Sequence, residues 1–496
     1  MDQIIKKENE EKDDVNNKDK ENNKLEENQN PKLRLSRIIR ILIFLCFFLI
    51  QLLNCSDGGV ISAEPNQIKK ELSIDDKAFG FFGSVVQIGR IIGTFSLMFF
   101  LDYFNRKYLI FFAILLKCTS FIMFIFITNF PIIIIFRFLQ GFSHIFPYVY
   151  FSAWVDQFGL QRYKTIMTSV IVTAPPIGSV LGFNISTFLN SYKYGFGVLV
   201  FVMLPLDIFL LFIPQKYFSK RIFFYKTISE EINGRQTVYS LFEIHKEIML
   251  SKNIKKNPSL LVWAQLLKPI FSTIVFARCI LLYSFMGLHY WIGDYFENVL
   301  GEEGRFVKSS IYSFVSLIGP TTGSIVGGVI CEYFGGYSKK NSSFICFIFS
   351  ILMGITAIFI PNVNSLSLFG IFLFLFFFFG NCMMPILVGI SFNSVDNANK
   401  GASYGLNSLI CTIFGTLPSP SIYGFINSKY KDRYKSLAMG FNLNFVWLNS
   451  LLVGINFLLR LKEKKVVDDL DIKNKIQLEL ESIQTCDDND EVLKKY

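Results

Sequence analysis

The sequence predicts an all-α polytopic membrane protein whose twelve transmembrane helices form two pseudo-symmetric six-helix bundles. The first observation is the composition, since 51% of the 496 residues are apolar and only 18% are charged. The second is that apolar runs long enough to cross a hydrocarbon core of about 30 Å recur along the chain. The third is that the charges gather in the two tails and one central stretch, whereas a soluble protein needs polar residues on every surface helix.

The composition also argues against several classes of function. The net charge of +10 does not indicate a nucleic-acid partner, because the excess cations flank the apolar runs, where they act as orientation signals. The nine cysteines include no C-x-x-C pair, so neither a metal site nor a disulfide framework is expected, and no cofactor is expected either. The motifs H-E-x-x-H, G-x-S-x-G and G-x-x-x-x-G-K-[ST] are absent, so we do not expect an enzyme.

Twelve spans follow from the apolar runs, six on each side of a polar stretch. The first bundle is expected at 38–213 and the second at 269–460. A cytoplasmic linker, 214–268, separates them, and a disordered tail, 1–37, precedes them, while a second tail, 461–496, follows. In chain order the expected spans are 38–60, 77–101, 108–128, 131–154, 165–189, 195–213, 269–297, 307–334, 341–360, 364–391, 400–427 and 435–460.

The positions of lysine and arginine predict the orientation of these spans. With the N-terminus in the cytoplasm, the inner loops hold cations such as Arg162 and Lys164, and the linker holds many more. Outer loops such as TNFP and PNVNS hold none, whereas the outer loop KYKDRYK before the last span holds several. The positive-inside rule therefore predicts that both termini and the linker are cytoplasmic. The sequence does not indicate which membrane the protein occupies.

The two halves of the chain resemble each other. The stretch GRIIGTFSLMFFLDYF (89–104) aligns without gaps with GPTTGSIVGGVICEYF (319–334), and PIGSVLGF (176–183) parallels PSPSIYGF (418–425). Duplicated six-helix halves are a transporter architecture, with substrate bound between the halves near the membrane midplane. Small residues four apart also predict close helix packing, here at Gly89, Gly93, Gly178, Gly182, Gly319 and Gly323.

A short charged loop separates the second and third spans. Its cations, Arg106 and Lys107, are expected to hold the loop in the cytoplasm. The acid that ends the second span, Asp102, recurs in the second half as Glu332. We predict that these acids make contacts present in one conformation only, so that the loop takes part in gating.

Three motifs resemble those of the major facilitator superfamily. FLDYFNRK resembles the loop pattern G-x-L-A-D-R-x-G-R-K, which Asp102, Arg106 and Lys107 match. RFLQGF (137–142) is similar to the fourth-helix pattern of that family, and APPIGSVLGF to its fifth-helix pattern. The resemblance implies the major facilitator fold over all twelve spans.

Within the superfamily, the first half most resembles the spinster-type branch. The similarity lies in an acid at the end of helix one, in the segment from Gly59 to Ser84, and in the arginine of helix four. Two positions differ, because the branch's acid–arginine pair reads Asp57-Gly58 here and His144 stands where the branch has Glu. The resemblance implies transport of lysolipids, sphingoid phosphates or related solutes, in some members with protons.

Four charged or titratable residues are expected inside the first bundle: Asp57, Arg90, Arg137 and His144. A charge in hydrocarbon costs about 2.5–3.5 kcal/mol, so each of these residues is expected to have a charged partner or a functional role. His144 and Tyr148 share one face of the fourth span with Arg137. We predict that Asp57 and Arg137 pair across the bundle in a substrate or proton pathway, or else only lock the helices together. His144 either couples to protons or stays neutral in a hydrogen bond.

The second bundle offers four further candidates for the pathway. The seventh span carries Tyr283, Tyr290 and Asp294 on one stripe, and the eleventh carries Asn407 ahead of the sequence PSP. Aromatic residues near the outer end of the seventh span belong either to an interfacial belt or to a cavity lining, and the deeper Tyr283 and Tyr290 are expected to line a cavity. The prolines are expected to break the eleventh helix and to free carbonyls inside a cavity.

The sequence favours a secondary transporter that moves a small organic solute or a lysolipid-like amphiphile by alternating access, with proton coupling left open. The alternatives are a facilitative uniporter of a polar metabolite, such as a sugar or amino acid, and a non-transporting membrane sensor with the same fold. A sensor needs a folded output domain, whereas the tails are short and charged. The expected partners are the substrate, membrane lipid and, in a coupled carrier, protons, and we expect a monomer.

Overall fold

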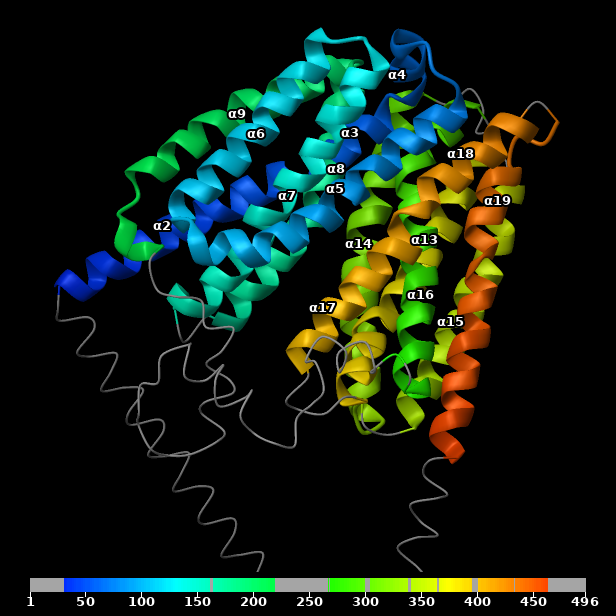
Figure 1. Cartoon of the computed structure of the whole chain (residues 1–496). Helices are drawn as coiled ribbons and strands as arrows, with labels where there is room; N and C mark the ends of the chain where they lie inside the picture. The colour runs from blue at the N-terminus through cyan, green and yellow to red at the C-terminus, as the bar shows by residue number, and fades with distance from the viewer. Residues whose placement is uncertain are drawn as a thin grey trace, which may run out of the picture.

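The computed structural model describes residues 31–160, 164–218, 266, 268–298, 304–337, 340–363, 365–394, 400–431 and 433–462. The regular elements within these ranges are helical (Figure 1). The linker and both tails predicted from the sequence lie almost wholly outside the described residues.

The first half runs from α2 to α9 (Figure 1). Its helices are α2 (Pro31–Asn54), α3 (Asp57–Ala63), α4 (Pro65–Leu72), α5 (Asp76–Tyr103), α6 (Arg106–Phe126), α7 (Phe130–Phe158), α8 (Lys164–Leu189) and α9 (Tyr192–Phe212), followed by the 3-10 turn η2 (Gln215–Tyr217). Polar N-caps begin three of them, because Asp75, Asn105 and Asn129 each accept a hydrogen bond from a backbone N–H of the first turn.

The second half runs from α13 to α19, and its last helix continues beyond a turn at Phe445 to Lys462. Its elements are α13 (Pro269–Asn298), α14 (Arg305–Tyr333), α15 (Asn341–Phe359), the 3-10 turn η4 (Ile360–Asn362), α16 (Leu366–Asn393), α17 (Lys400–Ile410), the π-helical turn η6 (Cys411–Thr416), α18 (Pro418–Tyr430) and α19 (Leu437–Asn444). Eleven helices of the described chain are long and apolar enough to cross a membrane, and α8 is not among them.

Besides the twelfth predicted span, with its turn at Phe445, two predicted spans have interrupted helices. The first, expected at 38–60, is broken at Cys55 and Ser56 into α2 and α3. The eleventh contains η6, where Leu417 N–H donates to the Thr412 carbonyl at 2.9 Å in place of a normal α-helical bond. Pro418 has no N–H of its own to donate. The expected break is therefore a π turn from which the helix continues as α18.

Glycines let equivalent helix pairs touch in the two halves. A Cβ added at Gly89 or Gly93 of α5 would lie 2.2 or 2.6 Å from a carbonyl oxygen of α7. In the second half, a Cβ at Gly323 of α14 would lie 2.4 Å from a carbonyl oxygen of α16, while Gly319 faces the Phe377 side chain at 3.1 Å. In each pair, a step of four residues along one helix moves the contact by four residues in the same direction along the other, so the two helices run parallel.

The same correspondence holds for a second set of helices. A Cβ at Gly178 or Gly182 of α8 would lie 2.2 or 2.0 Å from a carbonyl oxygen of Leu52 or Ser56, in the first span. Gly415 of η6 faces the Cys279 carbonyl of α13 at 2.6 Å in the same way. The pairing of helices therefore recurs in the two halves, although Gly415 precedes the repeated stretch 418–425 and Gly424, the counterpart of Gly182, faces the Asp76 carbonyl of α5 instead.

The two halves meet at one end of the molecule and diverge toward the other (Figure 1). We call the end at which the described chain begins and finishes the terminal end, and the opposite end, near α4, the far end. At the far end α5 crosses α18, where a Cβ at Gly80 would lie 2.4 Å from the Pro420 carbonyl oxygen. Ser84 of α5 also donates to the Leu417 carbonyl at 2.6 Å. The halves are thus joined at the far end by contacts that involve backbone carbonyl groups.

Candidate functional site

A buried carboxylate of the first half is shared by two cations. Asp57, in the first turn of α3, lies 3.3 Å from the Lys117 ammonium of α6 and 3.3 Å from the Arg137 guanidinium of α7. All three side chains are at most 4% exposed. We call these residues, with His144, the Asp57 cluster. The predicted proximity of Asp57 and Arg137 is present in this conformation, and Lys117 is the member that the sequence analysis missed.

The break between α2 and α3 creates a binding position for Lys117. Its ammonium donates to the Asn54 carbonyl at the end of α2, and its Nζ lies 3.2 Å from His144 Nδ1. Carbonyls at a helix C-terminus lack partners within the helix and favour a cation. His144 Nδ1 also lies 3.2 Å from the Asn54 carbonyl oxygen, so the ring tautomer decides whether Nδ1 accepts from the ammonium or donates to the carbonyl. The cation therefore lies against a broken helix, an imidazole and a carboxylate.

Arg137 uses only part of its guanidinium in the cluster. Nη1 contacts Asp57 and donates to Gln140 Oε1, while the guanidinium lies 5.0 Å from the centre of the Phe82 ring. The predicted stripe continues along α7, where the His144 ring stacks on Tyr148 at 5.6 Å. Tyr148 is 41% exposed, so this stripe leads from the buried charges to the surface of the half.

The cluster has more positive than negative charge. Lys117 and Arg137 share the single carboxylate of Asp57, and Arg90 of α5 lies near enough for its charge to act on that carboxylate. Within the described chain, the buried Nε atoms of Arg90 and Arg137 donate to no acceptor. The same holds for Nε and Nη1 of Arg278, in α13 of the second half. Arg90 and Arg137 therefore offer N–H donors to an acidic group near Asp57, while Arg278 belongs to the second half.

The candidates of the second half are not gathered into one polar centre. Tyr290 OH donates to the Phe79 carbonyl of the first half at 2.7 Å, whereas the buried Tyr283 OH has no hydrogen-bond partner in the described chain. Asn407 is buried and donates to Ser391 Oγ at 3.2 Å, within the second half. Asp294 belongs to an ion-pair cluster between the halves.

That cluster joins the halves at the far end. Lys69 of α4 lies 2.7 Å from Asp76 and 2.6 Å from Asp294 of α13, and Asn427 of α18 donates to both acids. Lys431 lies 3.6 Å from Asp294. Burial disfavours the charge of Lys69, but the Asp294 and Asp76 carboxylates hold the pKa of its ammonium above the usual range. We call these five residues the far-end cluster.

The far-end cluster has to separate if the halves open at that end. We predict that Lys69→Gln shifts the balance toward far-end opening by about 2 kcal/mol, or roughly 30-fold, because it leaves buried carboxylates underpaired. Distances between spin labels on α4 and α18 measure this shift. The matched control is Lys193→Gln, since Lys193 pairs with Glu71 of the same half at 2.5 Å. Equal distance distributions in Lys69→Gln and in wild type would show that the cluster does not bias the conformation.

The loop between α5 and α6 is described only in part. The Asp102 side chain lies outside the described residues, so the predicted gating contact stays a prediction. The Lys107 ammonium donates to the carbonyls of Leu211 and Ile213 at the end of α9, at 2.7 and 2.8 Å. Arg106 begins α6, and Glu332 is exposed near the end of α14.

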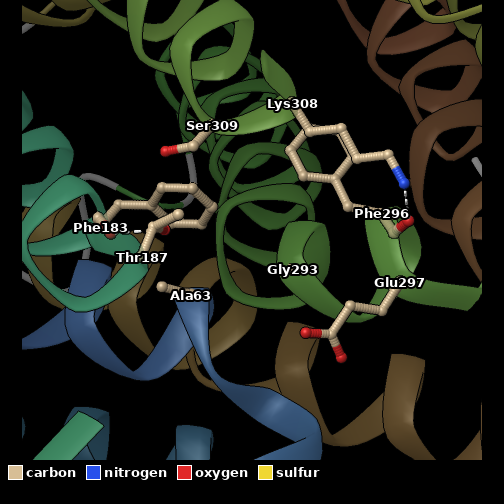
Figure 2. Close-up of a pocket in the computed structure, with 8 residues that line it drawn as sticks. All are labelled: Ala63, Phe183, Thr187, Gly293, Phe296, Glu297, Lys308 and Ser309. Carbon is tan, nitrogen blue, oxygen red and sulfur yellow. Dashed lines mark hydrogen bonds between the residues drawn. The ribbon is translucent and has the colours of Figure 1, made fainter. Parts of the chain in front are cut away.

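A small pocket of about 100 Å³ lies between the halves at the far end (Figure 2). Side chains of α3, α8, α13 and α14 line it. Lys308 donates to the Phe296 carbonyl at 2.9 Å, and Ser309 donates to Asn184 of the other half at 2.9 Å. Because both halves form its wall, the pocket depends on their contact.

The comparisons with known proteins agree with this architecture. The sequence model of the Major Facilitator Superfamily matches residues 41–444. Among solved structures, the chain is similar to a bacterial homologue of the human lysosomal transporter Spinster in its inward-facing, unoccupied conformation, with a TM-score of 0.67 and 13% identity over 86% of this chain and 98% of that chain. The occupied inward-facing form gives a TM-score of 0.63 and 12% identity over 86% of this chain and 97% of that chain.

The nucleoside transporter NupG gives a TM-score of 0.60 and 14% identity over 84% of this chain and 99% of that chain. A search of curated proteins gave no match. At these identities the likeness to solved structures concerns the fold alone, and the predicted fold class is confirmed.

Proposed function

Since the chain belongs to the major facilitator superfamily, we propose that it is a secondary transporter that moves an organic solute or a lysolipid-like amphiphile by alternating access. Two packed halves that meet at one end and diverge at the other support this mechanism. The far-end cluster supports it further, because contacts between halves are those that an alternating carrier breaks and remakes.

The observation that carries the proposal is the Asp57 cluster. Buried charge in a membrane bundle is costly and is retained where it binds a substrate, moves an ion or holds helices together. Here one carboxylate is shared by two cations, and further N–H donors lack acceptors in the described chain. The arrangement supports a substrate with a carboxylate or phosphate group that competes with Asp57 for Arg137, which can grip such a group with two parallel N–H bonds.

Transport by the purified full-length protein in liposomes tests the proposal. We expect flux of an acidic amphiphile, with a lysophospholipid as the probe, to exceed flux of an uncharged analogue. We also expect Arg137→Lys to lower this flux at least tenfold, because lysine keeps the charge but loses the fork geometry. Arg433→Lys, at an exposed position of the far end, is the matched control and should transport normally.

The outcome also separates the alternatives. A facilitative uniporter of a neutral metabolite would move the sugar or amino acid and would not depend on Arg137 in this way. A sensor would produce no flux of any solute in the panel. Wild-type flux of the acidic probe in Arg137→Lys would contradict the proposed role of the cluster.

A further inference from the structure

Asp207 is a buried acid that the proposed mechanism does not use. It lies on α9, two residues after Pro205, and is 1% exposed. Its Oδ1 has no hydrogen-bond partner, and the carboxyl forms no ion pair within the described chain. An isolated carboxylate in a low-dielectric interior costs several kcal/mol, and binding a proton removes that cost.

The surroundings of Asp207 offer no compensating cation in the described structure. α9 packs on α2, α3, α6 and α8. Two thiols, those of Cys46 in α2 and Cys118 in α6, lie near enough to Asp207 for a charge on its carboxylate to act on them. The ammonium of Lys107 is bound to carbonyls at the end of α9 instead. From α3, the nearest charged group is Asp57, which is paired with Lys117 and Arg137, and no described residue of α8 forms an ion pair with Asp207.

The groups of the Asp57 cluster are poorly suited to carrying a proton in this conformation. Protonation of Asp57 would leave two buried cations without their acid. His144 has its Nδ1 within 3.2 Å of the Lys117 ammonium, which opposes a second positive charge there. Asp207 has neither constraint, because charge is gained and lost there without breaking an ion pair of the described structure.

Asp207 is also close to one end of its helix. It precedes the last residue of α9, Phe212, by five residues, which corresponds to about 7.5 Å along the helix axis. α9 ends at the terminal end, where the halves diverge (Figure 1). A proton from the solution on that side therefore has about one and a half helical turns to cross.

We propose that Asp207 is a proton-binding site of the first half, and that a proton gradient acts on transport through the uptake of one proton by this carboxylate. The reaction is the addition of a proton from water to the carboxylate, with no other bond made or broken. The first part of the proposal stands on Asp207 alone, and the second part rests on the proposed transport function.

Infrared difference spectroscopy of the full-length protein tests the first part without any substrate. We expect a protonated-carboxyl C=O band at neutral pH in wild type that is absent in Asp207→Asn. Asp294→Asn, which changes an equally buried acid with cationic partners, should keep the band. If Asp207→Asn does not fold, Asp207→Glu keeps an acid and should move the band in frequency. A wild-type spectrum without the band, or a band that survives Asp207→Asn, would overturn the proton site.

Liposome flux with and without a pH gradient tests the second part. We expect wild-type flux to rise with the gradient and Asp207→Asn flux to be the same with and without it. A variant that still responds to the gradient like wild type overturns the coupling role. If wild type moves no solute at all, the proposed function fails, while the infrared band still decides whether Asp207 binds a proton.

Discussion

Asp57→Asn is expected to abolish transport and to lower the free energy of unfolding by about 3–5 kcal/mol. The reason is that Asp57 is the shared partner of Lys117 and Arg137, all at most 4% exposed, so that an amide leaves two buried cations uncompensated. Thermal unfolding in detergent measures the stability, and liposome flux measures the transport. Asp75→Asn is the control, because Asp75 is an exposed N-cap and asparagine caps a helix equally well.

A double variant separates charge balance from function. Asp57→Asn combined with Lys117→Met leaves Arg137 alone, so the three positions carry +1, as they do when two cations share one acid. We expect this variant to regain most of the lost stability and none of the lost transport. Wild-type stability and flux in the single variant Asp57→Asn would show that the cluster is dispensable.

Gly293→Val is expected to abolish transport by preventing the halves from joining at the far end. A Cβ at Gly293 of α13 would lie 1.9 Å from the Ser62 carbonyl oxygen of α3, in the other half. The obstacle is backbone, which cannot rotate away, so the joined state should lose about 3 kcal/mol or more. That is a shift above roughly 100-fold in the balance between conformations. Spin-label distances across the far end should lengthen.

The matched control for Gly293 is a glycine with the same geometry inside one half. A Cβ at Gly182 of α8 would lie 2.0 Å from the Ser56 carbonyl oxygen, so Gly182→Val should lower the unfolding temperature of the protein. Gly293→Val should instead keep the unfolding temperature, because the contact it blocks lies between halves. An unchanged far-end distance in Gly293→Val would contradict the expectation.

Much of the fold was predictable because each membrane-spanning helix corresponds to a long apolar run, which is a strong and local signal in the sequence. Apolar runs of bilayer length gave the spans, and the repeat of Gly89 and Gly93 as Gly319 and Gly323 reflects packing that recurs between α5 and α7 and between α14 and α16. The break at Cys55 and Ser56 was not predicted, although the stretch NCSDG (54–58) that contains it is rich in residue types that favour turns and helix caps.

The candidate site was less predictable, because its partners come from different helices. Lys117 and Asp207 are single charges within apolar spans, and such a residue is a strong signal for an interior role. What it pairs with depends on packing, as the contact between Lys69 and Asp294, 225 residues apart in sequence, illustrates. The cost of burial can therefore identify such residues, but the sequence spacing cannot identify their partners.

The shared carboxylate also has an electrical consequence. With two cations and one anion, Lys117, Arg137 and Asp57 carry a charge of +1 together. Moving one elementary charge through a membrane potential is worth about 2.3 kcal/mol per 100 mV. If the substrate is a monovalent acid, as proposed above, it would neutralise that charge. The loaded carrier would then reorient with little response to voltage, and the return of the empty carrier would be the voltage-dependent step. The membrane potential would then set the rate of recovery between cycles.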